Sequence, residues 1–128
     1  MKTIEVNRPQ WESFCERVSE SHRGARIKLD IENIEPRPGT EHADTTLKSI
    51  RIDDHMDPCN TLLIIETGEE NEKGMPYRII EPLHIRLRNG NDDRYTRIQI
   101  IAESGSTMIT MHPGLTADVA NAIATVAH

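Results

Sequence analysis

The stretch Ala25-Arg26-Ile27-Lys28-Leu29-Asp30-Ile31-Glu32 alternates apolar and charged residues without a break. A period of two is typical of a β-strand with one buried face and one face in water. The whole chain has 16 isoleucines against 7 leucines, and β-branched side chains fit a pleated, half-buried surface better than a helix. We therefore expect a protein built mainly of sheet, with an aliphatic core.

A helix is predicted immediately before this strand. Pro9 stands near its first turn and Gly24 is expected to end it. Between them, one stripe of a 3.6-residue period is formed by Trp11, Phe14, Cys15, Val18 and His22. A short strand, Thr3 to Val6, is expected ahead of the helix.

After the alternating stretch, Glu35-Pro36-Arg37-Pro38-Gly39 is expected to end the strand and open a loop to about Asp44, because proline lacks the donor of a central ladder. Thr45 to Asp53 is the next predicted strand, with a bulge between Leu47 and Ile50 where the alternation slips. Thr61 to Ile65 is apolar throughout, which predicts a central strand covered on both faces.

The second half of the chain predicts further short strands, separated by turns. They are joined so tightly that neighbours are expected to be antiparallel. Pro113-Gly114 then stops the last strand, and Leu115 to Ala127 is predicted as a second helix, with Thr116 as its N-cap. The strands are expected at 77–81, 83–88, 95–102 and 107–112.

These elements predict a single α+β domain over residues 1–128. The expected architecture is an N-terminal helix packed on a strongly twisted, six- to seven-stranded antiparallel sheet that curls toward an open barrel. The short C-terminal helix would cover a sheet edge or be exposed for association.

Composition limits the classes of function. The 128 residues contain 21 acids and 15 bases, so the formal net charge is −6. That balance is poor for general binding to nucleic acid or anionic lipid. No apolar run approaches the roughly 20 residues of a membrane helix, and the acidic N-terminus does not resemble a signal peptide. We expect a soluble, cytoplasmic protein without a recognisable nucleotide cofactor site.

The opening Thr3-Ile4-Glu5-Val6-x-Arg8-x-x-Trp11-x-x-Phe14, followed by Ser19-x-x-His22-x-Gly24, resembles a family of small bacterial proteins defined only as a domain of unknown function. The pattern Arg78-Ile79-Ile80-x-Pro82-x-x-Ile85-x-Leu87 is also similar to that family. The resemblance implies a helix followed by about six antiparallel strands, and it implies no catalytic or binding residue. The 35–44 loop and the C-terminal helix are not features of the family.

The turn Asp53-Asp54-His55-Met56-Asp57-Pro58-Cys59 is the densest group of metal-capable side chains, with Asp53, His55 and Asp57 as candidate ligands. The spacing matches neither a calcium loop nor a familiar zinc framework. Aspartates before a proline are ordinary turn residues, and this simpler interpretation is favoured. Cys59 lies beside His55 without an oxyanion hole, and Cys15 is expected to be a small core residue.

Arg86, Arg88 and Arg97 are expected to share one face of neighbouring strands, where they could bind an anion. Pairing with carboxylates across the strands is the favoured alternative, with partners among Asp30, Glu32, Glu81 and Glu103. The segment from Leu47 to Asp57 also resembles, faintly, the first motif of Sm-like RNA-binding barrels. The second motif of that family is absent, and Asp57 stands where the family usually has asparagine.

The sequence contains no recognisable catalytic set, so a non-enzymatic binding or assembly domain without a cofactor is the leading hypothesis. Its expected partner is a second copy of the chain, bound through the C-terminal helix or a sheet edge; nucleic acid is not the expected partner. Two alternatives stay open: an RNA-binding barrel using Arg86, Arg88, Arg97 and His55, and a metal or small-ligand site in the 53–59 turn.

Overall fold

The computed structural model describes residues 3–33, 39–53, 61–69, 74–89 and 96–111. The short strand β1 (Thr3–Val6) leads through a 3-10 turn (Arg8–Gln10) into the helix α1 (Trp11–His22). The remaining elements are strands: β2 (Arg26–Asn33), β3 (Gly39–Asp53), β4 (Leu62–Thr67), β5 (Met75–Ile80), β6 (His84–Asn89), β7 (Thr96–Ala102) and β8 (Gly105–Met111). This arrangement confirms the α+β class.

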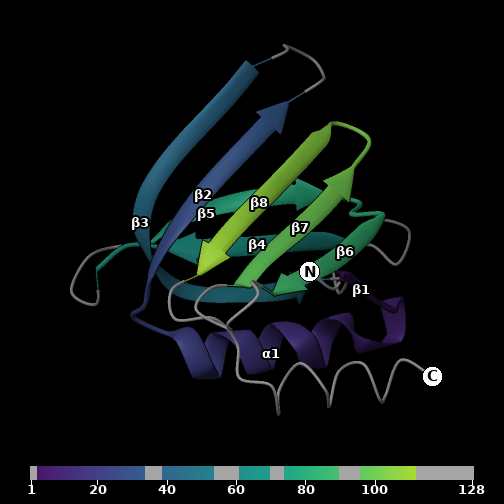
Figure 1. Ribbon diagram of the computed structural model, residues 1–128, viewed down its shortest axis with the longest axis horizontal. Helices are drawn as coiled ribbons and strands as arrows, with labels where there is room; N and C mark the ends of the chain where they lie inside the picture. Colours follow the sequence, from purple (N-terminus) through teal and green to yellow (C-terminus); the bar gives the residue numbers. More distant parts are fainter. Residues whose placement is uncertain (1–2, 34–38, 54–60, 70–73, 90–95, 112–128) are drawn as a thin grey trace.

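Within the described residues, eight strands form one antiparallel sheet in the order β1-β6-β7-β8-β2-β3-β4-β5. The expected number of six to seven strands was therefore wrong. The sheet is not closed, because β1 and β5 are its two edges. Figure 1 shows β2, β8, β7 and β6 on the near side and β4 and β5 behind them, with the long, bent β3 connecting the two layers.

Two further expectations about the strands need correction. Residues 39–44 belong to β3, not to a loop, because Gly39 to Thr46 pair with Asn33 to Arg26 in a long hairpin. Strand β4 is second from an edge, not central. Its apolar run reflects burial of Leu63 and Ile65 in the core and of Ile64 on the opposite face. The predicted bulge is confirmed, since the β3–β4 register shifts between Leu47 and Ser49.

The helix follows its prediction. All five residues of the apolar stripe are buried, and Gly24, with φ +85°, adopts the left-handed conformation that glycine favours after a helix. Ser19 fixes the helix to β3, because its Oγ lies 2.9 Å from both the N and the O of Ile50. The Trp11 indole Nε1 donates to the Val6 carbonyl at 2.8 Å, which joins α1 to β1.

One hydrophobic cluster fills the space between the two layers of the sheet and α1. Its buried members come from strands along the whole strand order, for example Val6 of β1, Ile98 of β7 and Leu63 of β4. Alternate residues of these strands point away from the core, and these form the outer face described below. The predicted helix over residues 115–127 lies outside the described residues.

Candidate anion-binding face

Strand order places charged side chains from distant parts of the sequence in one line. On the outer face, Thr3, Arg88, Arg97, Thr110 and Lys28 are successive register partners across β1, β6, β7, β8 and β2. We call this line the cationic row. Neighbouring strands lie about 4.8 Å apart, so the three cations span roughly 14 Å along the sheet surface.

The cationic row contains three basic residues and two threonines, and no carboxylate. The next residue beyond Lys28 is Asp44 on β3, where the row ends. Thr110 is only 9% exposed although it lies on the outer face, as expected for a short side chain between Arg97 and Lys28, whose long stems cover their neighbours. The exposed Arg97 and Lys28 therefore border a short, buried threonine.

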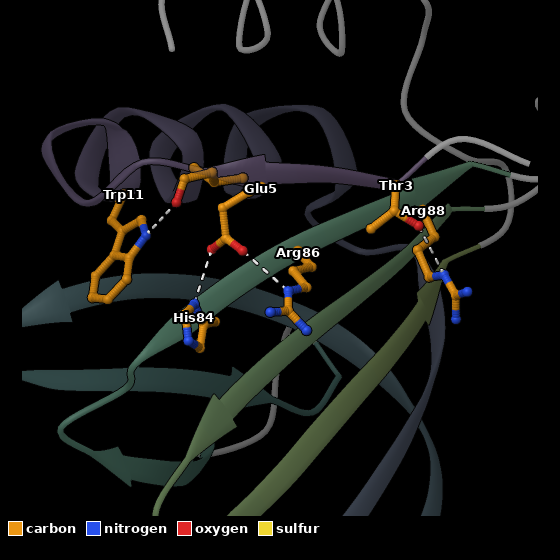
Figure 2. A network of polar contacts seen from close by, with 7 residues as sticks. Thr3, Glu5, Trp11, His84, Arg86 and Arg88 are labelled. Atoms are coloured by element: carbon orange, nitrogen blue, oxygen red, sulfur yellow. Dashed lines mark hydrogen bonds and ion pairs between the residues drawn. The ribbon is translucent and has the colours of Figure 1, made fainter.

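The neighbouring row, two residues along each strand, contains two carboxylates and one arginine. It consists of Glu5, Arg86, Gln99, Met108 and Asp30. Arg86 Nε donates to Glu5 Oε1 at 3.0 Å, and His84 Nδ1 lies 3.4 Å from Glu5 Oε2. Figure 2 shows Glu5 of β1 between these two side chains of β6. A carboxylate thus compensates Arg86 directly.

Arg88 differs from Arg86 in the chemistry of its partner. Its Nε donates to the Thr3 hydroxyl at 3.3 Å (Figure 2), a neutral group. On its other side the register partner is Arg97, a like charge. Arg97 makes a further interaction of its own. The two arginines still place two guanidinium groups on adjacent strands, which is an arrangement that a bidentate anion such as phosphate fits.

The structure brings the three arginine candidates together. Arg86, Arg88 and Arg97 do share one face of neighbouring strands, as predicted. The carboxylate found beside Arg86 is Glu5, which was not among the expected partners. Sequence reasoning also missed Lys28 as a member of the row, because the β2–β8 pairing that brings it there joins residues about 80 apart and no local pattern indicates it.

The candidate metal ligands lie mostly beyond the described part of the chain. Asp53 is the last residue of β3, is half-buried and has an interaction partner. His55, Asp57 and Cys59 lie outside the described residues. Among the residues that are described, no group of three or more His, Cys, Asp and Glu side chains could hold a metal ion. The metal hypothesis for this turn therefore stays a prediction.

Cys15 is a core residue, as predicted. It is 1% exposed on the inner face of α1. Burial, together with the neighbouring Glu12 and Glu16 carboxylates, raises the pKa of its thiol from 9.0 to about 12. Because the thiolate is the reactive form of cysteine, Cys15 is a poor nucleophile.

The helix of the described region, α1, has 12 residues, and no helix in the ranges that the structure describes is long and apolar enough to cross a membrane.

The resemblances to a bacterial family and to Sm-like barrels stay predictions. Comparisons with protein-family models, with curated proteins and with solved structures find no significant match to this chain.

Proposed function

We propose that this chain is a non-enzymatic binding domain that holds an anionic partner along the cationic row. The observation that carries the proposal is the register itself, which aligns Lys28, Arg88 and Arg97 on one face. Charges held on adjacent strands of a sheet are already positioned before a ligand arrives, so little ordering is needed on binding. The adjacent row, which has two carboxylates and one arginine, limits the basic surface to a narrow line.

A non-catalytic role is supported by what the described residues offer chemically. Cys15 is buried, with a pKa of about 12. The cationic row carries guanidinium, ammonium and hydroxyl groups, which bind anions but do not by themselves constitute a nucleophile with an adjacent base. Such a surface is suited to holding a partner.

Binding of a partner is favoured over self-assembly through a sheet edge. Strand β1 has only four residues, and β5 carries Pro76, which cannot donate a backbone hydrogen bond. Short edge strands and edge prolines both oppose the addition of another strand. Association through the predicted C-terminal helix concerns residues outside the described ranges.

Single-stranded RNA is the specific form of the proposal to test first, because its phosphodiester backbone presents regularly spaced anions. On the described part of the outer face there is no Phe, Trp or Tyr on which bases could stack, so binding should depend on phosphates and not on base identity. Three phosphate contacts would give a slope of log K against log salt of about −2 for a single strand.

The experiment is fluorescence anisotropy with labelled oligouridylate and oligoadenylate at several salt concentrations. The double variant Arg88→Gln/Arg97→Gln should bind about tenfold more weakly, and its salt slope should be smaller by about 1.4. Arg86→Gln is the matched control, because Glu5 already compensates that arginine, and it should bind within about twofold of the unchanged protein. Absence of salt-dependent binding would refute the proposal. Equal losses of affinity in the double variant and in Arg86→Gln would also refute it.

A further inference from the structure

A second feature lies apart from the cationic row, where the end of α1 meets the bend of β3. A cavity of about 530 Å³ is lined there by Arg23 and Gly24 after the helix, by residues 46–49 of β3, and by Glu66 and Gly68. This volume is within the range of roughly 300–1,000 Å³ that is usual for small-molecule sites. None of its lining residues belongs to the cationic row.

Backbone hydrogen bonds hold the walls of the cavity in place. The Gly24 amide donates to the Leu47 carbonyl at 2.8 Å, and the Leu47 amide donates to the Ala25 carbonyl at 2.9 Å. On the other side, the Gly68 amide donates to the Thr46 carbonyl at 2.9 Å. The segments that form the cavity are thus fixed to one another before any ligand binds.

The β-bulge places a cation at this site. Leu47 pairs with Thr67 and Ser49 pairs with Glu66, so Lys48 between them has no register partner on β4. A bulged residue leaves the regular alternation and can be directed toward a site. Arg23 and Lys48, which also makes an interaction of its own, thus give the cavity two basic side chains, and Glu66, the register partner of Ser49, gives it a carboxylate.

The Glu66 carboxylate and the exposed Arg23 guanidinium of this cavity are not paired with each other. Within the described ranges, neither the Arg23 nor the Glu66 side chain takes part in an ion pair or a hydrogen bond. The Glu66 side chain packs closely against Gly74, since a Cβ at Gly74 would lie 2.6 Å from Glu66 Cγ and 2.8 Å from its Oε1.

We propose that the cavity binds a small zwitterion, whose carboxylate lies against Arg23 and Lys48 and whose ammonium group lies against Glu66. The walls are held by backbone hydrogen bonds, the Arg23 and Glu66 side chains are not paired with each other, and a molecule with both charges can contact both. A ligand with only one charge makes one of these contacts. An amino acid is the simplest molecule of this class.

The gap between the charges can be measured with a series of ω-amino acids, from glycine to 6-aminohexanoate. Amide chemical shifts in ¹⁵N-labelled protein report binding at Gly24, Ser49 and Gly68. We expect one chain length to bind best, and acetate or methylammonium at the same concentration to bind at least about tenfold more weakly, because each makes one of the two charged contacts. If no member of the series shifts these amide signals, the proposal is overturned.

Variants identify the contacts. Glu66→Gln and Arg23→Gln should each weaken binding of the best ω-amino acid about tenfold or more. Gly74→Ala should weaken it without changing any charge, because the new methyl group displaces the Glu66 side chain. The same spectra show whether each variant is folded.

The matched controls are Glu20→Gln and Arg17→Gln, which change the same chemical groups on the exposed side of α1 and should leave binding unchanged. Equal losses in the controls and in the cavity variants would also overturn the proposal. The RNA measurement uses other residues, so the two proposals fail independently of each other.

Discussion

Arg88 on β6 and Arg97 on β7 lie directly opposite each other in the ladder, and both point to the outer face of the sheet. Two residues away on β6, Arg86 is 3.0 Å from the carboxylate of Glu5. Cross-strand pairs of opposite charge stabilise a sheet and like charges destabilise it. The same strand therefore carries one compensated arginine and one that faces a like charge.

The first prediction follows from this contrast. Arg88→Glu creates an opposite-charge pair with Arg97 and should increase the free energy of unfolding by roughly 0.2–1 kcal/mol. Arg86→Glu places a second carboxylate beside Glu5 and should decrease it by a similar amount. Urea unfolding of the two variants at low salt measures the difference.

High salt serves as the internal control, because screening should bring the two variants closer together. Arg88→Glu should also bind oligouridylate more weakly than the unchanged protein, so the more stable variant should be the weaker binder. If both substitutions shift stability in the same direction, the register does not determine the local electrostatics.

A second prediction concerns the link between the helix and the sheet. The buried Ser19 hydroxyl donates a hydrogen bond to the Ile50 carbonyl and accepts one from the Ile50 amide. Ser19→Ala leaves these two backbone groups without their partner and should lower the free energy of unfolding by about 2 kcal/mol. Ser13, on the exposed side of the same helix, donates to the Gln10 carbonyl at 3.1 Å and lies 3.5 Å from Gln10 Oε1.

Ser13→Ala is therefore the matched control and should change stability by less than about 0.5 kcal/mol. Chemical denaturation followed by the fluorescence of Trp11, the one tryptophan of the chain, measures both variants. Equal effects of the two substitutions would show that the Ser19 bonds contribute nothing beyond helix propensity.

Local patterns were sufficient for most individual elements. The stripe from Trp11 to His22 predicted α1, the alternation after Ala25 predicted β2, and the slip after Leu47 predicted the bulge. Each of these depends on residues that are close in sequence. The grouping of Arg86, Arg88 and Arg97 was also accessible, because the hairpin of β6 and β7 is local.

Pairings between distant segments were not accessible. The β1–β6 ladder brings Glu5 to Arg86, and the β2–β8 ladder brings Lys28 to Thr110. Alternation shows which side of a strand faces water but not which strand lies beside it. For this reason the strand count, the position of β4 and the place of Lys28 in the cationic row could be seen only in the structure. The cavity beside Glu66 depends on the same long-range arrangement.

A third prediction concerns the open edge at β5. Pro76 pairs with Glu66 in register and lacks a donor that an added strand could use. Pro76→Thr introduces that donor and should produce concentration-dependent association in sedimentation velocity. Arg78→Thr, at an exposed position of the same strand, introduces a threonine without removing the proline and is therefore the comparison, which should stay monomeric. A monomer at all concentrations for Pro76→Thr would mean that another feature protects this edge.

The last prediction is the pH dependence contributed by Cys15. Its thiol has a pKa of about 12 in the folded protein, chiefly because of burial, against 9.0 for an ordinary thiol. Above pH 9 the unfolded chain loses this proton while the folded chain keeps it. The folded state then binds more protons, so its stability falls as the pH rises. The contribution is fully present below pH 9 and is lost between pH 9 and about pH 12.

Comparison with Cys15→Ala isolates this contribution, with Cys59→Ser in both proteins so that no disulfide forms at high pH. From pH 8 to pH 10.5, the free energy of unfolding should fall by about 2 kcal/mol more in the protein that retains Cys15, because each pH unit above the unfolded pKa costs about 1.4 kcal/mol. Removal of the thiol also leaves a small cavity, which lowers stability equally at every pH. The difference in slope is therefore the test, and parallel pH profiles would mean that the Cys15 thiol titrates alike in the folded and unfolded states.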